Sequence, residues 1–190
     1  MKTKIQEHLN KSINAKKAIL KAGVDEIAEA GLKLISVIKN GGKILVCGNG
    51  GSAADAQHFT AELVGRFKLE RKAYPAIAFT TNTSILTAIG NDYGYDEIFL
   101  RQLQALAQPK DLLFGITTSG KSANIIKSFE YAKKNNIFTI SLTGSPGMPL
   151  AGFADIALVV PFHETAIIQE AHICVIHILC MLLDEYGQMS

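Results

Sequence analysis

The feature that most constrains the fold is an alternation of short apolar runs with longer helical segments. Apolar runs of strand length lie at residues 43–47, 75–81, 111–117, 137–143 and 155–161. Segments with helical periodicity lie at about 52–66, at 85–107 with a break near Gly90, at about 122–134 and at about 165–186. This alternation predicts an α/β fold with a five-stranded parallel sheet, because parallel strands need crossover helices and are buried on both faces.

Residues 1–40 precede the alternation and have helical periodicity of their own. Ile5, Leu9, Ile13 and Leu20 form one apolar stripe, and a second helical period follows Gly23. We therefore expect an N-terminal helical segment over 1–40 and the main domain over 41–190, with no second domain. A leading helix outside the alternating pattern commonly packs on another subunit, so we expect an oligomer.

Composition narrows the function classes. The chain has 190 residues, 48% of them hydrophobic and 19% charged, which is typical of one globular domain. The net charge of +2 and the lack of a basic patch argue against nucleic-acid binding. The apolar stretch 173–183 is short of the roughly 20 residues that cross a bilayer. No signal peptide begins the chain, and three cysteines in apolar runs indicate buried, reduced thiols. These features predict a cytoplasmic protein without membrane association.

A glycine-rich segment, GNGGSAAD at 48–55, follows the first apolar run. Glycines let backbone N–H groups approach a ligand closely, and the N-terminus of the helix that follows favours anions. Ser52 and Asp55 have the spacing of a capping box, which predicts the helix start. The segment matches neither a dinucleotide-binding motif nor a P-loop. Its residues alone leave two interpretations open, an anion-binding loop and a tight turn without a ligand.

A second polar loop follows the third apolar run. It brings four hydroxyl groups together, on Thr117, Thr118, Ser119 and Ser122. Hydroxyls and free N–H groups bind phosphate without a metal, and ligands of parallel sheets bind at the carboxyl ends of the strands. The alternatives are an ordinary Ser/Thr capping loop and, for Lys121, a solvated side chain. The density of hydroxyls favours a phosphate site.

Two helical segments carry side chains that can bind a metal or move protons. His58 and Glu62 are four residues apart, so they lie on one helix face about one turn beyond the glycine loop. They suit metal binding or acid–base chemistry, and they equally suit an ordinary surface pair. The last segment carries Gln169, His172 and His177 in an apolar run, where buried histidines need partners. Spacing alone does not decide whether His172 or His177 acts with Gln169.

The segments GNGGSAADAQH and TTSGKSAN resemble, in order and spacing, the two ligand loops of the sugar-isomerase (SIS) domain family. The resemblance covers nearly the whole chain and implies a single SIS domain. It assigns the phosphate to the Ser/Thr loop and the sugar chain to the glycine loop. The segment 90–93, otherwise a simple turn, matches a family segment that meets substrate hydroxyls. The substrate-binding residues implied in this way are Asn49, Gly50, Gly51, Ser52, Asn91, Asp92, Thr117, Thr118, Ser119, Ser122 and Gln169.

The segments HFTAE at 58–62 and IQEAH at 168–172, with the later His177, resemble the signature of phosphoheptose isomerases, which are zinc-binding SIS enzymes. The resemblance implies an aldose–ketose isomerase that converts sedoheptulose 7-phosphate to D-glycero-D-manno-heptose 7-phosphate through a cis-enediol, in lipopolysaccharide biosynthesis. It implies zinc held by His58, Glu62, Gln169 and His177, with Glu62 and His177 as the acid–base pair. It also implies a homotetramer with active sites at subunit interfaces.

Two positions depart from the family pattern. Residues 165–167 read Thr-Ala-Ile where many members carry polar or charged side chains, and Lys121 replaces a common asparagine. The main alternative function is that of an SIS regulator that binds the replication initiator protein. Such regulators share the glycine loop and a segment like 67–71 but lack the full acidic and histidine set, so Glu62 and His177 favour an enzyme. A sugar-phosphate sensor and a hexose-phosphate isomerase are further alternatives.

Overall fold

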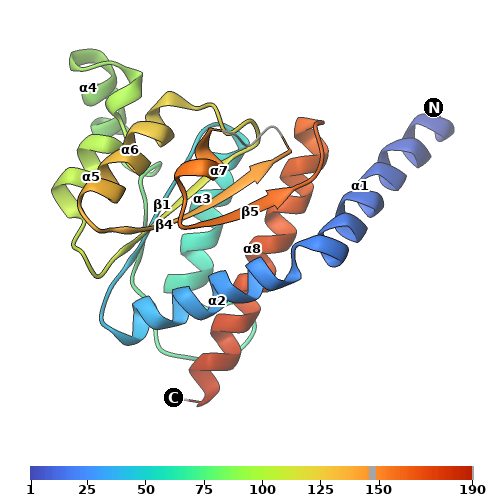
Figure 1. Ribbon diagram of the computed structural model, residues 1–190, viewed down its shortest axis with the longest axis horizontal. Coiled ribbons are helices and arrows are strands. Elements are labelled where there is room, and N and C mark those ends of the chain that lie inside the picture. The colour runs from blue at the N-terminus through green and yellow to red at the C-terminus, as the bar shows by residue number, and fades with distance from the viewer. Residues whose placement is uncertain (146–148, 190) are drawn as a thin grey trace.

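The computed structural model describes residues 1–145 and 149–189, and a five-stranded parallel sheet lies at its centre (Figure 1). Its strands are β1 (Ile44–Gly48), β2 (Ala76–Ala78), β3 (Leu112–Thr117), β4 (Phe138–Gly144) and β5 (Ile156–Val160). Their order in the sheet is β2-β1-β3-β4-β5, and every neighbouring pair is parallel. The predicted fold class is confirmed.

Helices cover both faces of this sheet because alternate strand residues point to opposite sides. Ile44 and Val46 belong to a core shared with α1, α2, α3 and α8, whereas Leu45 and Cys47 belong to a core shared with α5, α6 and α7. The helices are α1 (Lys2–Ala22), α2 (Val24–Lys39), α3 (Gly51–Val64), α4 (Thr83–Asp92), α5 (Leu100–Leu106), α6 (Ala123–Lys134), α7 (Leu150–Phe153) and α8 (Thr165–Met189), with a short 3-10 turn η1 (Tyr95–Glu97).

Two sequence predictions differ from the structure in detail. The helical segment expected at 85–107 was placed with a break near Gly90, but α4 continues through that residue to Asp92. The chain turns at Gly94 instead, where a φ of +94° suits glycine, and α5 follows η1. The second strand is also shorter than the expected run 75–81, because the chain turns at Phe79 and Thr80.

The N-terminal half of α1 projects away from the rest of the molecule (Figure 1). Ile5, Leu9 and Ile13 of the predicted stripe are 54%, 56% and 49% exposed. Ion pairs between Lys11 and Glu164 and between His8 and Glu170, each 2.7 Å long, join α1 to the start of α8 and its approach. The apolar stripe therefore lies uncovered on a helix that is anchored along its other side.

Helix α8 is the main apolar element of the larger core. Among the described residues it is the one helix whose length and composition would allow it to cross a membrane, and 50% of its most apolar window is buried inside the protein. The core helix of a soluble domain meets the same criterion. The packing of α8 against the sheet explains its composition.

One histidine lies inside this core. His172 has no exposed surface, and neither of its ring nitrogens has a hydrogen-bond partner among the described residues. Burial lowers the pKa of His172 to about 4 and outweighs the opposing effect of the Thr143 backbone. The partner expected for a buried histidine is therefore missing, and the ring stays neutral at pH 7.

The buried His172 predicts that the protein loses stability in acid. Its pKa is about 4 in the folded state and near the ordinary 6.5 when unfolded, so the unfolded state binds more protons between these values. The free energy of unfolding should therefore fall by about 3 kcal/mol as the pH drops through this window. Urea unfolding from pH 8 to pH 4 should show this slope, and His172→Leu should lack it.

The exposed His163 provides the matched control. His163→Leu, which replaces a histidine outside the core, should keep the wild-type slope. Parallel curves for wild type and His172→Leu would contradict the assignment.

Candidate active site

A pocket of about 300 Å³ lies at the carboxyl edge of the sheet. Strands β1 and β3 are neighbours, with Gly48 paired to Ile116, so the loops that follow them emerge side by side. The structure thus brings together most of the predicted substrate-binding residues, which are Asn49, Gly50, Gly51, Ser52, Thr117, Thr118, Ser119, Ser122 and Gln169; Ile116 and Thr165 complete the lining.

The first loop depends on glycine at two positions. Gly50 has a φ of +57° and forms the N-cap of α3, a conformation that other residues rarely adopt. A Cβ atom on Gly51 would lie 2.4 Å from Nε2 of Gln169, so a larger residue would displace the Gln169 amide from this loop. The expected capping box is absent, because α3 begins one residue before Ser52 and has no side-chain cap. The N–H groups of Ser52 and Ala53 already donate to the carbonyls of Asn49 and Gly50, both at 3.0 Å, so α3 favours an anion here mainly through its dipole.

The second loop presents hydroxyl groups at the start of α6. The hydroxyls of Thr117 and Ser122 are 3.2 Å apart, and Ser122 is the N-cap of the helix. Lys121 is exposed and is not among the residues that line the pocket. Two helix N-termini and several hydroxyls therefore face the same space, which suits an anion such as phosphate.

Beyond the pocket, α3 and α8 bring three titratable side chains together. Nε2 of His58 lies 3.2 Å from Oε1 of Glu62 and 3.1 Å from Nε2 of His177. The His58 side chain is 44% exposed and that of Glu62 is 23% exposed. Burial and the neighbouring His58 lower the pKa of His177, and Glu62 opposes this effect. His177 is thus neutral near pH 7 and can both donate and accept a proton.

Similarity to known proteins identifies the family of this chain. The family model of the SIS domain matches residues 7–144. The chain belongs to the SIS domain family.

Relatives within this family are similar along almost their whole length. The phosphoheptose isomerase of Campylobacter jejuni strain 81116 is 53% identical over 95% of this chain and 94% of its own. That of Helicobacter pylori strain P12 is 49% identical over 96% and 97%. The solved structure of phosphoheptose isomerase from Neisseria gonorrhoeae superposes with a TM-score of 0.92 at 44% identity, covering 97% of this chain and 98% of that one.

Two of the predicted substrate-binding residues, Asn91 and Asp92, lie outside the pocket. Asn91 and Asp92 lie at the exposed end of α4, where the Asn91 amide donates to Oδ1 of Asp92 at 2.8 Å. Neither residue is among those that line the pocket of this chain. Their role in substrate binding stays a prediction.

Gln169 lies at the pocket rather than with the other predicted metal ligands. Its amide packs against Gly51, and no hydrogen bond joins it to His58, Glu62 or His177 in the described part of the chain. Gln169 is eight residues before His177, about two helical turns along α8. The structure thus unites three of the four predicted ligands.

The three united side chains suit zinc in their chemistry. Imidazole nitrogen and carboxylate oxygen are common zinc ligands, and donors on one tetrahedral ion lie about 3.3 Å apart, close to the separations of 3.1 and 3.2 Å found here. The described residues nevertheless include no group of three or more His, Cys, Asp or Glu side chains that could hold a metal ion as placed. We attribute this to the two imidazoles, whose nitrogens face each other in a hydrogen bond. They would have to turn toward a common point to bind zinc.

Three polar residues near the site were not found by sequence analysis. Asn124, 2% exposed, pairs its amide reciprocally with that of Asn49, at 2.9 and 3.0 Å, and so ties the two loops together. The Tyr95 hydroxyl donates to Oδ1 of Asn49 at 2.9 Å. Asp55, one turn before His58, has a buried Oδ2 with no hydrogen-bond partner in the described part of the chain, and burial raises its pKa. Asn124 and Asp55 had a sequence signal, their places in the segments TTSGKSAN and GNGGSAADAQH, whereas Tyr95 had none.

From the Asn49–Asn124 pair we predict that the pocket depends on Asn124, although Asn124 does not line it. Asn124→Ala leaves the Asn49 amide without its buried partner, so we expect a loss of about 1–3 kcal/mol in stability and weaker binding of a ketose phosphate. Calorimetric titration and urea unfolding measure the two effects.

Asn135, at the other end of α6, is the matched control, because its amide donates at 2.9 Å only to the Tyr131 carbonyl of its own helix. Asn135→Ala should keep the wild-type affinity. Equal affinities of the wild type and both variants would refute the coupling of the two loops.

Proposed function

We propose that this chain is a phosphoheptose isomerase that converts sedoheptulose 7-phosphate to D-glycero-D-manno-heptose 7-phosphate. The observation that carries the proposal is the sharing of two helices, α3 and α8, by an anion pocket and a His–Glu–His cluster. Support comes from relatives of that name, 53% and 49% identical over nearly the whole chain. The reaction would be the first step toward ADP-heptose and the lipopolysaccharide core.

The pocket binds the phosphate and part of the sugar. Hydroxyls of Thr117, Ser119 and Ser122 and the N-termini of α3 and α6 would neutralise the phosphate without a metal. Asn49 and Gln169 would hydrogen-bond the sugar chain. Binding energy from these groups, which are remote from the reacting carbons, positions C1 and C2 near the cluster.

The reaction moves a proton between C1 and C2 through a cis-enediol. Glu62 would remove the carbon-bound proton from C1 of the ketose and return a proton to C2. His177, neutral near pH 7 because its pKa is lowered, would carry a proton between the two oxygens, donating to one and accepting from the other. Each proton removed is thereby returned, so the reaction is an isomerisation.

We also propose zinc as the cofactor. His58, Glu62 and His177 would hold it, with Gln169 as a fourth ligand after a movement of its side chain. Zinc would polarise the carbonyl group and stabilise the negative charge of the enediolate. A carboxylate bound to zinc is a weaker base, so the roles of Glu62 as ligand and as base compete.

The proposal extends to a cytoplasmic homotetramer. The uncovered stripe of Ile5, Leu9 and Ile13 on α1 supports assembly, because about half of each apolar side chain meets solvent in the single chain. Asn91 and Asp92, which lie outside the pocket, would reach substrate from a neighbouring subunit. The alternative, a regulator that binds the replication initiator, finds no support in the relatives described above.

Turnover should depend on Glu62 and His177. Glu62→Gln and His177→Gln preserve size but remove the base and the proton carrier, so we expect kcat to fall about 10²- to 10⁴-fold. Appearance of the aldose from sedoheptulose 7-phosphate is the measurement. Glu185→Gln, at an exposed position of α8, should retain wild-type kcat. Substantial turnover by Glu62→Gln would show that another group is the base.

Zinc binding is tested separately from turnover. Purified protein should retain about one zinc ion per chain, and His58→Ala should bind it at least about tenfold more weakly in competition with a fluorescent chelator. The exposed His163→Ala should bind zinc like the wild type. Equal affinities of His58→Ala and wild type would place the ion elsewhere.

A further inference from the structure

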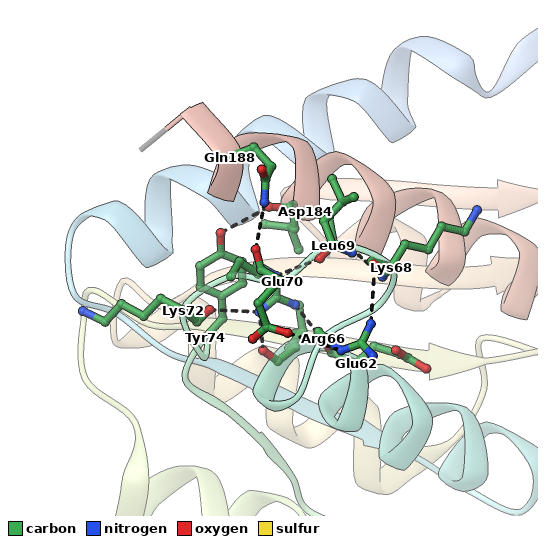
Figure 2. Close-up of polar contacts among 12 residues, drawn as sticks. Glu62, Arg66, Lys68, Leu69, Glu70, Lys72, Tyr74, Asp184 and Gln188 are labelled. Carbon is green, nitrogen blue, oxygen red and sulfur yellow. Dashed lines mark hydrogen bonds and ion pairs between the residues drawn. The ribbon is translucent and has the colours of Figure 1, made fainter.

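A buried ion pair joins α8 to the segment that follows α3. Nε of Arg71 donates to Oδ1 of Asp184 at 2.8 Å, and the two side chains are only 0% and 2% exposed. The partners are 113 residues apart in sequence. Figure 2 shows Asp184 at the centre of a set of polar contacts between these two parts of the chain. A pair so deeply buried restricts how the two helices can move against each other.

The Arg71 guanidinium also caps the end of α3. Nη2 donates to the backbone carbonyl of Glu62 at 2.7 Å, and Nη1 donates to the carbonyl of Leu63 at 3.0 Å. These carbonyls belong to the last turn of α3, which has no further helical N–H groups to bond them. The cation thus satisfies the negative end of the helix and holds the backbone of Glu62 itself.

The second carboxylate oxygen of Asp184, Oδ2, also accepts hydrogen bonds. Oδ2 accepts the backbone N–H groups of Lys68 at 2.7 Å and Leu69 at 2.9 Å. Burial alone would raise the pKa of Asp184, but these N–H groups and Arg71 outweigh burial and lower it. The carboxylate is therefore charged at neutral pH and bonded through both oxygens.

The location of the ion pair connects it to the acid–base cluster. Asp184 follows His177 by seven residues, two turns along the same face of α8. Arg71 holds Glu62, which is four residues beyond His58 on α3. The pair therefore fixes the separation and rotation of α3 against α8 on the side of the cluster that lies away from the phosphate pocket.

We propose that the Arg71–Asp184 pair positions Glu62 and His177 for proton transfer, an inference that rests on the proposed isomerase function. Arg71 and Asp184 are positioning residues and contact no substrate. The phosphate pocket lies at the opposite end of α3, at Gly50 to Ser52, and neither Arg71 nor Asp184 is among the residues that line it. Loosening the pair should therefore misplace the cluster and leave substrate binding nearly intact.

The chain offers a matched control in Asp111. This carboxylate is 1% exposed, accepts the backbone N–H groups of Lys43 at 2.9 Å and Gln108 at 2.7 Å, and pairs with the Lys43 ammonium group. It resembles Asp184 in burial and in bonding. It lies just before β3, at the edge of the sheet opposite the pocket. Asp184→Asn and Asp111→Asn should both lower stability.

The experiment compares Asp184→Asn, Arg71→Lys and Asp111→Asn with wild type in steady-state kinetics on sedoheptulose 7-phosphate, well below each unfolding midpoint. We expect kcat to fall about a hundredfold for the first two variants, because a misplacement of about 1 Å has that effect. Their KM should stay within about threefold, and Asp111→Asn should keep the wild-type kcat. Arg71→Lys keeps the charge but loses the planar fork, so it also serves if Asp184→Asn does not fold.

A second measurement tests the positioning of His58 and His177 without relying on the proposed function. The imidazole NMR signals of His58 and His177 should shift in Asp184→Asn and Arg71→Lys but not in Asp111→Asn, whatever reaction the protein catalyses. If wild type has no turnover, the isomerase proposal fails and these signals still test the positioning. Unshifted signals, or equal losses of kcat in the Asp184 and Asp111 variants, would overturn the inference.

Discussion

The close approach of α3 to α8 is the constraint on which the rest of the structure depends. Both helices pack on the same face of the sheet, through buried residues such as Phe59 on α3 and Ile176 on α8. At one end of their contact, Gly51 leaves room for the Gln169 amide, and at the other Arg71 and Asp184 join them. Between these two contacts, α3 and α8 are held at a fixed separation. The glycine loop, Gln169 and the His–Glu–His cluster take their positions from this pair of helices.

This arrangement separates binding from chemistry in space. The pocket presents hydroxyls and helix N-termini, which suit an anion and titrate far from neutral pH. The cluster consists of imidazoles and a carboxylate, the groups that enzymes commonly use as general acids and bases. The same separation explains why phosphate contacts could be inferred without a metal, whereas zinc suits only the cluster.

Sequence reasoning was effective where local rules apply. The alternation of runs predicted five parallel strands, and the neighbouring carboxyl ends of β1 and β3 placed the two loops together. The His58–Glu62 spacing correctly predicted one helix face. Spacing could not decide between His172 and His177, because α8 is apolar on most sides and its rotation is set by packing. In the structure His172 faces the core and His177 faces His58.

Contacts between distant segments were beyond sequence reasoning for the same reason. Nothing local indicates that Arg71 meets a residue 113 positions later, or that the Asn124 amide pairs with Asn49. The break expected at Gly90 was misplaced because a glycine within a helix is tolerated, whereas the positive φ at Gly94 requires one. Propensity identifies where a chain can turn, and tertiary packing decides where it does.

The most direct test of the account is an NMR measurement of sedoheptulose 7-phosphate incubated with wild-type protein in D₂O. The account predicts that the aldose phosphate appears with deuterium at C2, because Glu62 is partly exposed and exchanges the proton taken from C1 before returning one. Absence of the aldose would contradict the isomerase assignment. Aldose formed without deuterium would contradict proton transfer by a solvent-accessible base between α3 and α8.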